Sequence, residues 1–276
     1  MEKKPDMNAA GAPTVESISI LDSEGKKDIV GYRNSEREKE RVGSLFQLVP
    51  MNGNRVLDIG ARDGFLSLLL AERYASVTAL DLDPPRIDHP RVTCVHGDMT
   101  AMEFNDGAFD MVLCAEVLEH IPPALLPKAC AEISRVARDR VVIGVPFRQD
   151  IRLGRSDCLA CGGKNPPYGH VNAFDEKKLA SLFPGLSVER FHYVGKTRER
   201  TNAVSTLLMD FAGNPYGTYG QEEGCVHCGA KLKEPQHRNF AQKVATFTAH
   251  RLRLLLNRFS TPRANWIHVS LRKPAA

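Results

Sequence analysis

The sequence predicts an α/β fold with a mostly parallel sheet, and three features support this prediction. Short apolar segments rich in β-branched residues recur near residues 55–59, 76–81, 91–95, 109–114 and 140–145. Helical segments lie between them, and this alternation is typical of a parallel sheet with helices on both faces. The last of these segments is almost continuously apolar, as in a buried parallel strand. The first ends in a glycine-containing turn that opens a helix.

Further elements extend this core. The pattern predicts helices over 34–49 and 174–183, and strands over 186–194 and 265–272. Residues 1–28 are polar and aperiodic, so we expect a flexible N-terminal arm. We assign the core domain to 29–194 plus 265–276. Residues 148–171 and 195–264 exceed what such a core needs, and we interpret them as insertions.

The composition is that of an ordinary globular protein. Of 276 residues, 42% are hydrophobic and 25% are charged. The net charge of +4 is too small to indicate a nucleic-acid partner by itself. No apolar run approaches the roughly 20 residues of a membrane span, and no apolar signal-peptide region follows Lys3 and Lys4. We therefore expect a cytoplasmic protein; its oligomeric state is not specified.

Acidic residues at strand ends indicate a nucleoside-containing cofactor. Gly60 and Gly64 flank a tight turn, where glycine lets the backbone approach a ligand closely. Asp81 follows Asp58 by 23 residues, and a carboxylate at about this distance suits the two hydroxyls of a ribose. A dehydrogenase would need Gly-x-Gly-x-x-Gly at the turn, and this spacing is absent.

Four motifs in order resemble class I S-adenosylmethionine-dependent methyltransferases of the ubiquinone-biosynthesis type. They are Val-Leu-Asp-Ile-Gly at 56–60, Asp81, Gly97-Asp98, and Glu-Val-Leu-Glu-His-Ile at 116–121. The resemblance covers roughly residues 50–195 and a final strand near 265. It implies a Rossmann-like, seven-stranded methyltransferase sheet whose last strand is antiparallel, inserted between strands five and six. The turn departs from the family's Gly-x-Gly-x-Gly, because Arg62 occupies the middle position.

The resemblance also implies a set of cofactor-binding residues. Asp81 would accept hydrogen bonds from the ribose, and Asp98 from the adenine amino group, with Met99 against the ring. Tyr32 and Arg33 are within reach of the methionine end; alternatively they are a packing tyrosine and a solvated arginine. The whole predicted set is Asp58, Gly60, Ala61, Gly64, Asp81, Leu82, Asp98, Met99, Ala115, Tyr32 and Arg33.

Candidate catalytic residues follow the fourth and fifth strands. Glu116, Glu119 and His120 would share one face of a helical turn. His170 belongs to a Gly-His-x-x-x-Phe segment that lies near the acceptor in similar methyltransferases. Glu116, His120 and His170 are therefore the predicted catalytic residues. The alternatives are support of the cofactor pocket, a second metal site at residues 116–120, or a histidine that only packs.

Four cysteines predict a structural zinc site. Cys158 and Cys161 form one Cys-x-x-Cys pair, and Cys225 and Cys228 form another, each followed by glycine. Four thiolates make the closed tetrahedral site typical of structural Zn²⁺. The pairs lie in the two insertions, which would leave the same edge of the sheet. We expect zinc to join the insertions into a lid or substrate subdomain; redox pairs or buried thiols are the alternative.

The sequence leaves the methyl acceptor and its reacting atom open. We favour O-methylation of a small molecule or a glycan or natural-product precursor. One alternative is a methyltransferase that acts on RNA or protein and binds it through the zinc knuckle, the turn that the Cys-x-x-Cys-Gly pairs would form around the metal. Another is a zinc-dependent interaction protein with a vestigial cofactor site. A predicted helix over 240–259 is basic and has an apolar side, and either packs on the domain or contacts a membrane surface or anionic acceptor.

Overall fold

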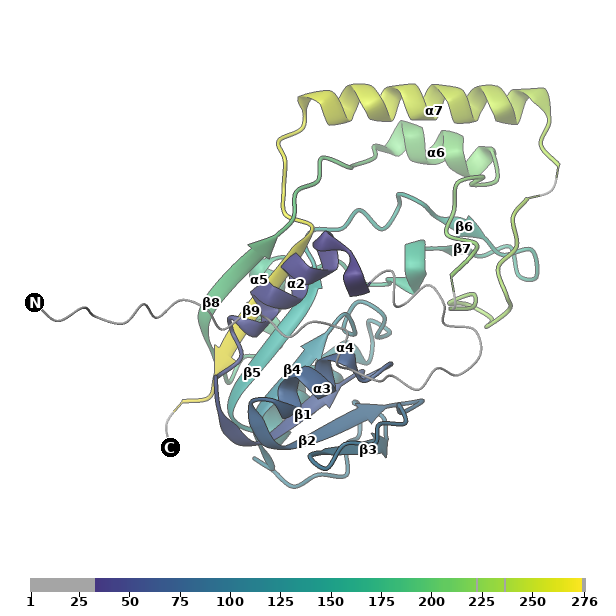
Figure 1. Ribbon diagram of the computed structural model, residues 1–276. Coiled ribbons are helices and arrows are strands. Elements are labelled where there is room, and N and C mark those ends of the chain that lie inside the picture. Colours follow the sequence, from purple (N-terminus) through teal and green to yellow (C-terminus); the bar gives the residue numbers. More distant parts are fainter. Residues whose placement is uncertain (1–32, 222, 236, 275–276) are drawn as a thin grey trace, which may run out of the picture.

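The computed structural model describes residues 33–221, 223–235 and 237–274, and it has one seven-stranded sheet at its centre (Figure 1). The strand order is β3-β2-β1-β4-β5-β9-β8. The strands are β1 (Gly53–Ile59), β2 (Tyr74–Asp81), β3 (Val92–His96), β4 (Phe109–Ala115), β5 (Ala137–Pro146), β8 (Ser187–Val194) and β9 (Trp266–Arg272). Strands β1 to β5 pair in parallel, and β9 is antiparallel to both neighbours. The predicted sheet with its inserted last strand is confirmed.

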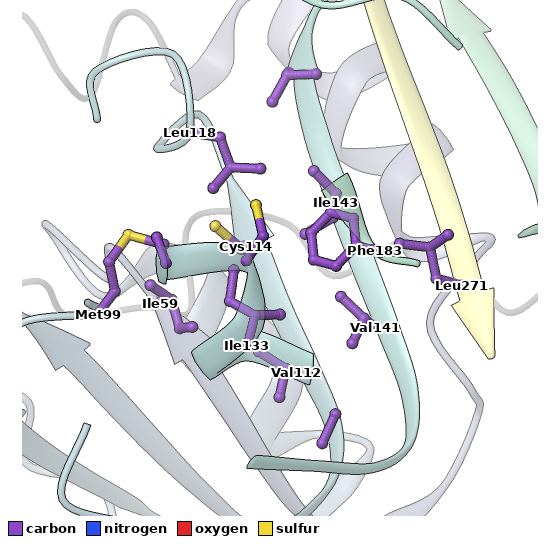
Figure 2. Packing of buried hydrophobic residues seen from close by; sticks show 14 of the residues in the cluster. Ile59, Met99, Val112, Cys114, Leu118, Ile133, Val141, Ile143, Phe183 and Leu271 are labelled. Atoms are coloured by element: carbon purple, nitrogen blue, oxygen red, sulfur yellow. The ribbon is translucent and has the colours of Figure 1, made fainter. Parts of the chain in front are cut away.

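Helices cover both faces of this sheet. Helices α2 (Glu36–Phe46) and α3 (Phe65–Ala71) pack on one face, and α4 (Leu126–Val136) and α5 (Glu176–Leu182) pack on the other. Figure 2 shows the second face, where Ile133 of α4 packs against Val112 and Ile143 of the central strands. The side chains of Ser35 and Asp175 cap α2 and α5 by accepting a backbone N–H.

The remaining segments lie beyond the carboxyl edge of the parallel strands. After β5 comes a short hairpin, β6 (Ser156–Asp157) with β7 (Lys164–Asn165), and a 3-10 turn, η2 (Pro167–Gly169). After β8 come α6 (Ala203–Phe211) and α7 (Phe240–Phe259), which pack on each other. In Figure 1 these elements form a layer above the sheet, with α7 outermost.

Some local expectations need correction. The helix predicted over 34–49 is shorter, and α6 was not predicted, because no element was assigned to residues 203–211 of the second insertion. Helix α7 has the predicted bounds, but several of its large apolar side chains, among them Phe240, Phe247 and Leu255, are mostly exposed. Its buried residues are Ala245, Thr246 and Ala249, and Ala249 lines the cavity described below. Residues 1–28 and Tyr32 lie outside the described residues.

Candidate functional site

The loops that follow β1, β2 and β3 meet at the carboxyl edge of the sheet. Gly60 has φ 73°, and a Cβ there would lie 2.3 Å from the Val117 side chain, so this turn requires glycine. The Asp81 carboxylate accepts hydrogen bonds from the Arg62 N–H (2.8 Å) and the Asp83 N–H (3.0 Å). The Gly97 N–H donates to the Asp81 carbonyl (3.0 Å). Asp81 therefore lies between the glycine turn and the turn after β3.

Asp58 lies beneath the glycine turn. It is buried, and the Ser67 hydroxyl of α3 donates to its carboxylate at 2.5 Å. Burial raises the pKa of Asp58 to about 7, although the Ser67 hydrogen bond lowers it. The carboxylate of Asp58 thus fixes α3 against β1, which holds the turn in place.

The turn after β3 carries the residues predicted to meet an adenine. Asp98 is exposed, and its carboxylate accepts the Thr100 N–H at 2.7 Å, so it stabilises its own turn. Met99 is buried in the core on the α4 face (Figure 2). Leu82 is mostly exposed.

A cavity of about 1010 Å³ lies between this edge and the inserted layer. Both parts of the chain line it: Gly60, Arg62 and Ala115 from the sheet side, and Pro167 and Thr201 from the insertions. Of the predicted site residues, the lining includes Arg33, Gly60, Ala61, Ala115, Glu116, His120 and His170. It does not include Asp58, Gly64, Asp81, Leu82, Asp98 or Met99 among the described residues.

An ionic network joins α2 to the cavity wall. Arg33 donates to the Asp63 carboxylate from Nε (3.1 Å) and Nη2 (2.9 Å), and it also pairs with Glu38. Glu38 is buried and accepts two hydrogen bonds from Arg41, both 2.8 Å. Arg33 is therefore part of a network rather than a solvated side chain. The sequence showed Glu38 and Arg41 only as helix formers, because their partners are set by tertiary contacts.

Glu116 occupies a strained position next to this network. Its φ is 58°, in the left-handed region, and its carboxylate accepts the Trp266 indole N–H at 3.1 Å. Arg41 lies 3.9 Å from the same carboxylate. Burial raises the pKa of Glu116, and Arg41 opposes this effect. Residues 116–120 form a turn, so the helical face expected for Glu116, Glu119 and His120 is not present. All three nevertheless line the cavity.

Glu119, His120 and His170 form a compact group in the wall. One potential donor atom of each lies within 4.8 Å of the others. Neither carboxylate oxygen of Glu119 has a hydrogen-bond partner among the described residues, although the side chain is fully buried. Burial, and then the negative charge of Glu116, raise the pKa of Glu119 well above its ordinary value. Such a group is suited to acid–base chemistry or to holding a cation.

The two histidine rings are in contact, with centroids 4.7 Å apart and planes nearly perpendicular. Nδ1 of His170 lies 2.6 Å from Oε1 of Gln149. Because a carboxamide oxygen only accepts, Nδ1 carries the hydrogen and Nε2 keeps a lone pair. Burial, together with His120, lowers the pKa of His170 to about 3, and burial lowers the pKa of His120 as well. Both rings are therefore neutral near pH 7. Sequence spacing gave no sign that His170 lies beside Glu119.

The four predicted cysteines converge in the inserted layer. All four sulfurs lie within 4.8 Å of one another, and the Cys158–Cys228 and Cys161–Cys225 pairs are each 3.7 Å apart. A disulfide needs about 2.05 Å, whereas four ligands about 2.3 Å from a tetrahedral Zn²⁺ lie about 3.8 Å apart. The cluster therefore fits zinc.

The backbone around the cysteines is that of two matching knuckle turns. Gly162 and Gly229 have φ 71° and 73°, and each donates its N–H to the carbonyl of the first cysteine of its pair. Burial raises the pKa of Cys225, but hydrogen bonds from the His227 and Cys228 amides outweigh this effect and bring the pKa down to about 6. The geometry thus favours a thiolate.

Asn165 joins the two knuckles. It is fully buried; its amide N–H groups donate to the Gly163 and Ser156 carbonyls, and its Oδ1 accepts the Val226 N–H at 2.8 Å. Nothing in the sequence indicated this role, because the partners of Asn165 are set by tertiary contacts.

Comparisons with known proteins agree with this fold. Residues 57–143 match the family model described as a methyltransferase domain. A ubiquinone biosynthesis O-methyltransferase of Xylella fastidiosa (strain 9a5c) is 37% identical over 107 residues, which is 34% of this chain and 42% of that protein. The protein of the same name from Paracidovorax citrulli is 30% identical over 105 residues, covering 34% and 44%. The chain thus matches less than half the length of these relatives.

Solved structures extend the likeness beyond the matched segment. The N-methyltransferase NodS of Bradyrhizobium japonicum WM9, solved in complex with S-adenosyl-L-homocysteine, has a TM-score of 0.50 at 13% identity, covering 91% of this chain and 94% of that chain. The cyclase SpnF has a TM-score of 0.51 at 15% identity, covering 87% and 83%. At this identity the likeness establishes the fold alone.

Proposed function

We propose that this protein is an S-adenosylmethionine-dependent methyltransferase that methylates an oxygen of a small molecule or glycan or natural-product precursor. The observation that carries the proposal is that the glycine turn and Glu116 line one large cavity, with Asp81 hydrogen-bonded to that turn, within a segment that matches a methyltransferase domain. The relatives named O-methyltransferases support oxygen as the acceptor atom.

The residues at the sheet edge fit such a cofactor. Asp81 has carboxylate oxygens at the turn that can accept from ribose hydroxyls. Gly60 and Ala61 present little side chain to the cavity, so the backbone can lie close to a ligand. Arg33 and Arg37 line the same cavity and would complement a carboxylate at the methionine end. S-adenosylmethionine supplies a methyl group on a sulfonium, which is already a good leaving group.

The work left for the chain is to orient the acceptor, exclude water and remove a proton. We assign proton removal to the Glu119–His120–His170 group. A neutral imidazole would accept the proton that an acceptor hydroxyl loses when its oxygen is methylated. The raised pKa of Glu119 favours its protonated form, so Glu119 would stabilise the imidazolium only by giving up its own proton as that cation forms beside it. Gln149 positions His170 by accepting its Nδ1–H.

The acceptor side of the cavity is rich in arginine. Arg152, Arg155, Arg253 and Arg263 line it, all from the insertions. The Nε atoms of Arg253 and Arg263 are buried without a hydrogen-bond partner among the described residues. Arg152 pairs with Asp150, and Arg155 pairs with Asp210. Arg253 and Arg263 have no ion pair among the described residues, and these two favour an acceptor that carries negative charge, such as a carboxylate or phosphate. Zinc at the four cysteines would hold the two insertions together and so maintain this wall.

Calorimetry with S-adenosylmethionine tests the proposal. We expect binding to the wild-type chain and roughly 10- to 100-fold weaker binding of Asp81→Asn, since hydrogen bonds to a charged group contribute about 1.5–3 kcal/mol. Asp88→Asn, in the exposed loop after β2, is the matched control and should bind as the wild type does. No binding by the wild type would leave only a zinc-dependent interaction protein. Salt-sensitive retention of RNA would instead favour the nucleic-acid alternative.

A further inference from the structure

The outer face of α7 carries large apolar side chains that nothing in the described part of the chain covers. Phe240 is 82% exposed and Phe247 is 60% exposed. Val244, Leu254 and Leu255 are exposed as well. These positions lie 4, 7, 14 and 15 residues after Phe240, so they share one side of a helix with 3.6 residues per turn. An apolar stripe of this length on a free surface indicates a partner.

The neighbouring helix α6 adds to the exposed apolar surface. Val204, Leu207 and Phe211 are exposed at helical spacing. The Gln242 side chain of α7 donates to the Phe211 carbonyl, which joins the C-terminal end of α6 to the start of α7. Other residues of both helices, among them Met209 and Ala249, line the cavity. The two-helix layer thus has an inner face toward the cavity and an apolar outer face.

The charge on α7 is of one sign. The helix contains no Asp or Glu, and Lys243, Arg251 and Arg258 are exposed among the apolar residues. The Arg251 guanidinium lies 5.0 Å from the Phe247 ring centroid, so cation and aromatic ring occupy the same part of the surface. Basic residues beside exposed Phe and Leu are the pattern of helices that lie in a membrane interface.

We infer that the outer face of α6 and α7 docks on the surface of an anionic lipid bilayer. None of the helices in the described residues is long and apolar enough to cross a membrane, so α7 would lie in the plane of the interface. A second copy of the chain fits this face poorly. A two-fold contact between these faces would bring the basic residues of one α7 against the α7 of the other copy, which has no Asp or Glu to compensate them.

Docking in this way would hold the cavity close to the bilayer, since the same two helices form part of the cavity wall. An amphipathic acceptor held in the membrane could then enter without crossing water. The docking itself does not depend on the proposed chemistry and is measured without cofactor or acceptor.

Vesicle co-sedimentation of the full chain tests this inference. We expect binding to vesicles of phosphatidylcholine and phosphatidylglycerol in equal parts, and much weaker binding to phosphatidylcholine alone. Phe247→Ser/Leu254→Ser should weaken binding at least about tenfold through lost apolar burial. Arg251→Glu/Arg258→Glu should weaken vesicle binding about 25-fold or more, because each basic residue near an anionic surface contributes about fivefold to binding.

Met51→Ser is the matched control, because Met51 is 74% exposed but precedes β1, at the opposite edge of the sheet. It should bind vesicles as the wild type does, and all variants should keep the wild-type melting temperature because the replaced side chains are exposed. Equal binding of wild type and Phe247→Ser/Leu254→Ser would overturn the inference, as would equal binding to neutral and anionic vesicles. A wild-type dimer in light scattering that Phe247→Ser/Leu254→Ser abolishes would also overturn it, in favour of a second copy.

Discussion

The cysteine cluster gives the sharpest test of how the inserted layer is held together. Cys225→Ser removes one of four sulfurs that lie within 4.8 Å of one another. Serine is almost the same size, but its hydroxyl is not a thiolate and is a poor zinc ligand. We expect about one zinc per chain in the wild type and a large loss of zinc in Cys225→Ser.

The size of the effect follows from the distance along the chain between the two knuckles. While the sheet stays folded, the two knuckles are joined through residues 148–161 and 195–225, the parts of the insertions that open. Closing a loop of roughly 45 residues costs about 4 kcal/mol of chain entropy on the polymer estimate for cross-links. Without the metal, this constraint on the open state is lost. The free energy for opening the inserted layer should therefore fall by about 4 kcal/mol, which corresponds to a roughly 10³-fold change in the opening equilibrium.

Amide hydrogen exchange read out by mass spectrometry measures this opening directly. Exchange should accelerate by about two to three orders of magnitude in α6 and α7, and little in β1 and β4. Cys94→Ser is the matched control, since Cys94 lies in β3, outside the cluster. Unchanged exchange in α6 and α7 of Cys225→Ser would refute the idea that zinc holds the two insertions together. A wild-type chain that purifies without zinc under mild conditions would refute it as well.

Three further predictions concern buried polar groups. Asp58 has its pKa raised to about 7, so the folded chain binds an extra proton between about pH 4 and 7 and loses up to about 4 kcal/mol of stability as pH rises through that window. Asp58→Asn should flatten this dependence in denaturant titrations; an identical pH profile would contradict the assignment. The lowered pKa of His170 means that its ring signals in NMR, assigned with His170→Gln, should not titrate between pH 8 and 5, and a midpoint near 6.5 would be inconsistent with its burial. Stability that depends on this neutral ring is lost as pH falls from about 6.5 toward 3. Asn165→Ala leaves the Val226 N–H without its acceptor and should lower the melting temperature and the zinc affinity, whereas exposed Asn239→Ala should change only the start of α7.

The positions of the strands and the order of the motifs follow from the sequence by itself. Apolar runs, glycine turns and aspartates at strand ends are local patterns, and local backbone preferences reproduce them directly. Once five strands alternate with helices, the handedness of crossovers leaves few possible arrangements. The sequence could therefore predict that Asp81 and Glu116 both lie at the carboxyl edge of the sheet. The zinc site was equally predictable from the sequence, because two Cys-x-x-Cys-Gly pairs are a spacing typical of metal ligation.

Only the tertiary structure decided which side chains face one another. Nothing in the spacing places His170 beside Glu119, since the two belong to loops after different strands. The network of Arg33, Glu38 and Asp63 likewise depends on how α2 packs over the glycine turn. Helix α7 shows the same limit: its periodicity predicts an apolar side but not which side turns inward. Ala245, Thr246 and Ala249 lie on the buried side, whereas Phe240, Phe247 and Leu255 are exposed on the outer surface, and only the packing of α7 on α6 decides this.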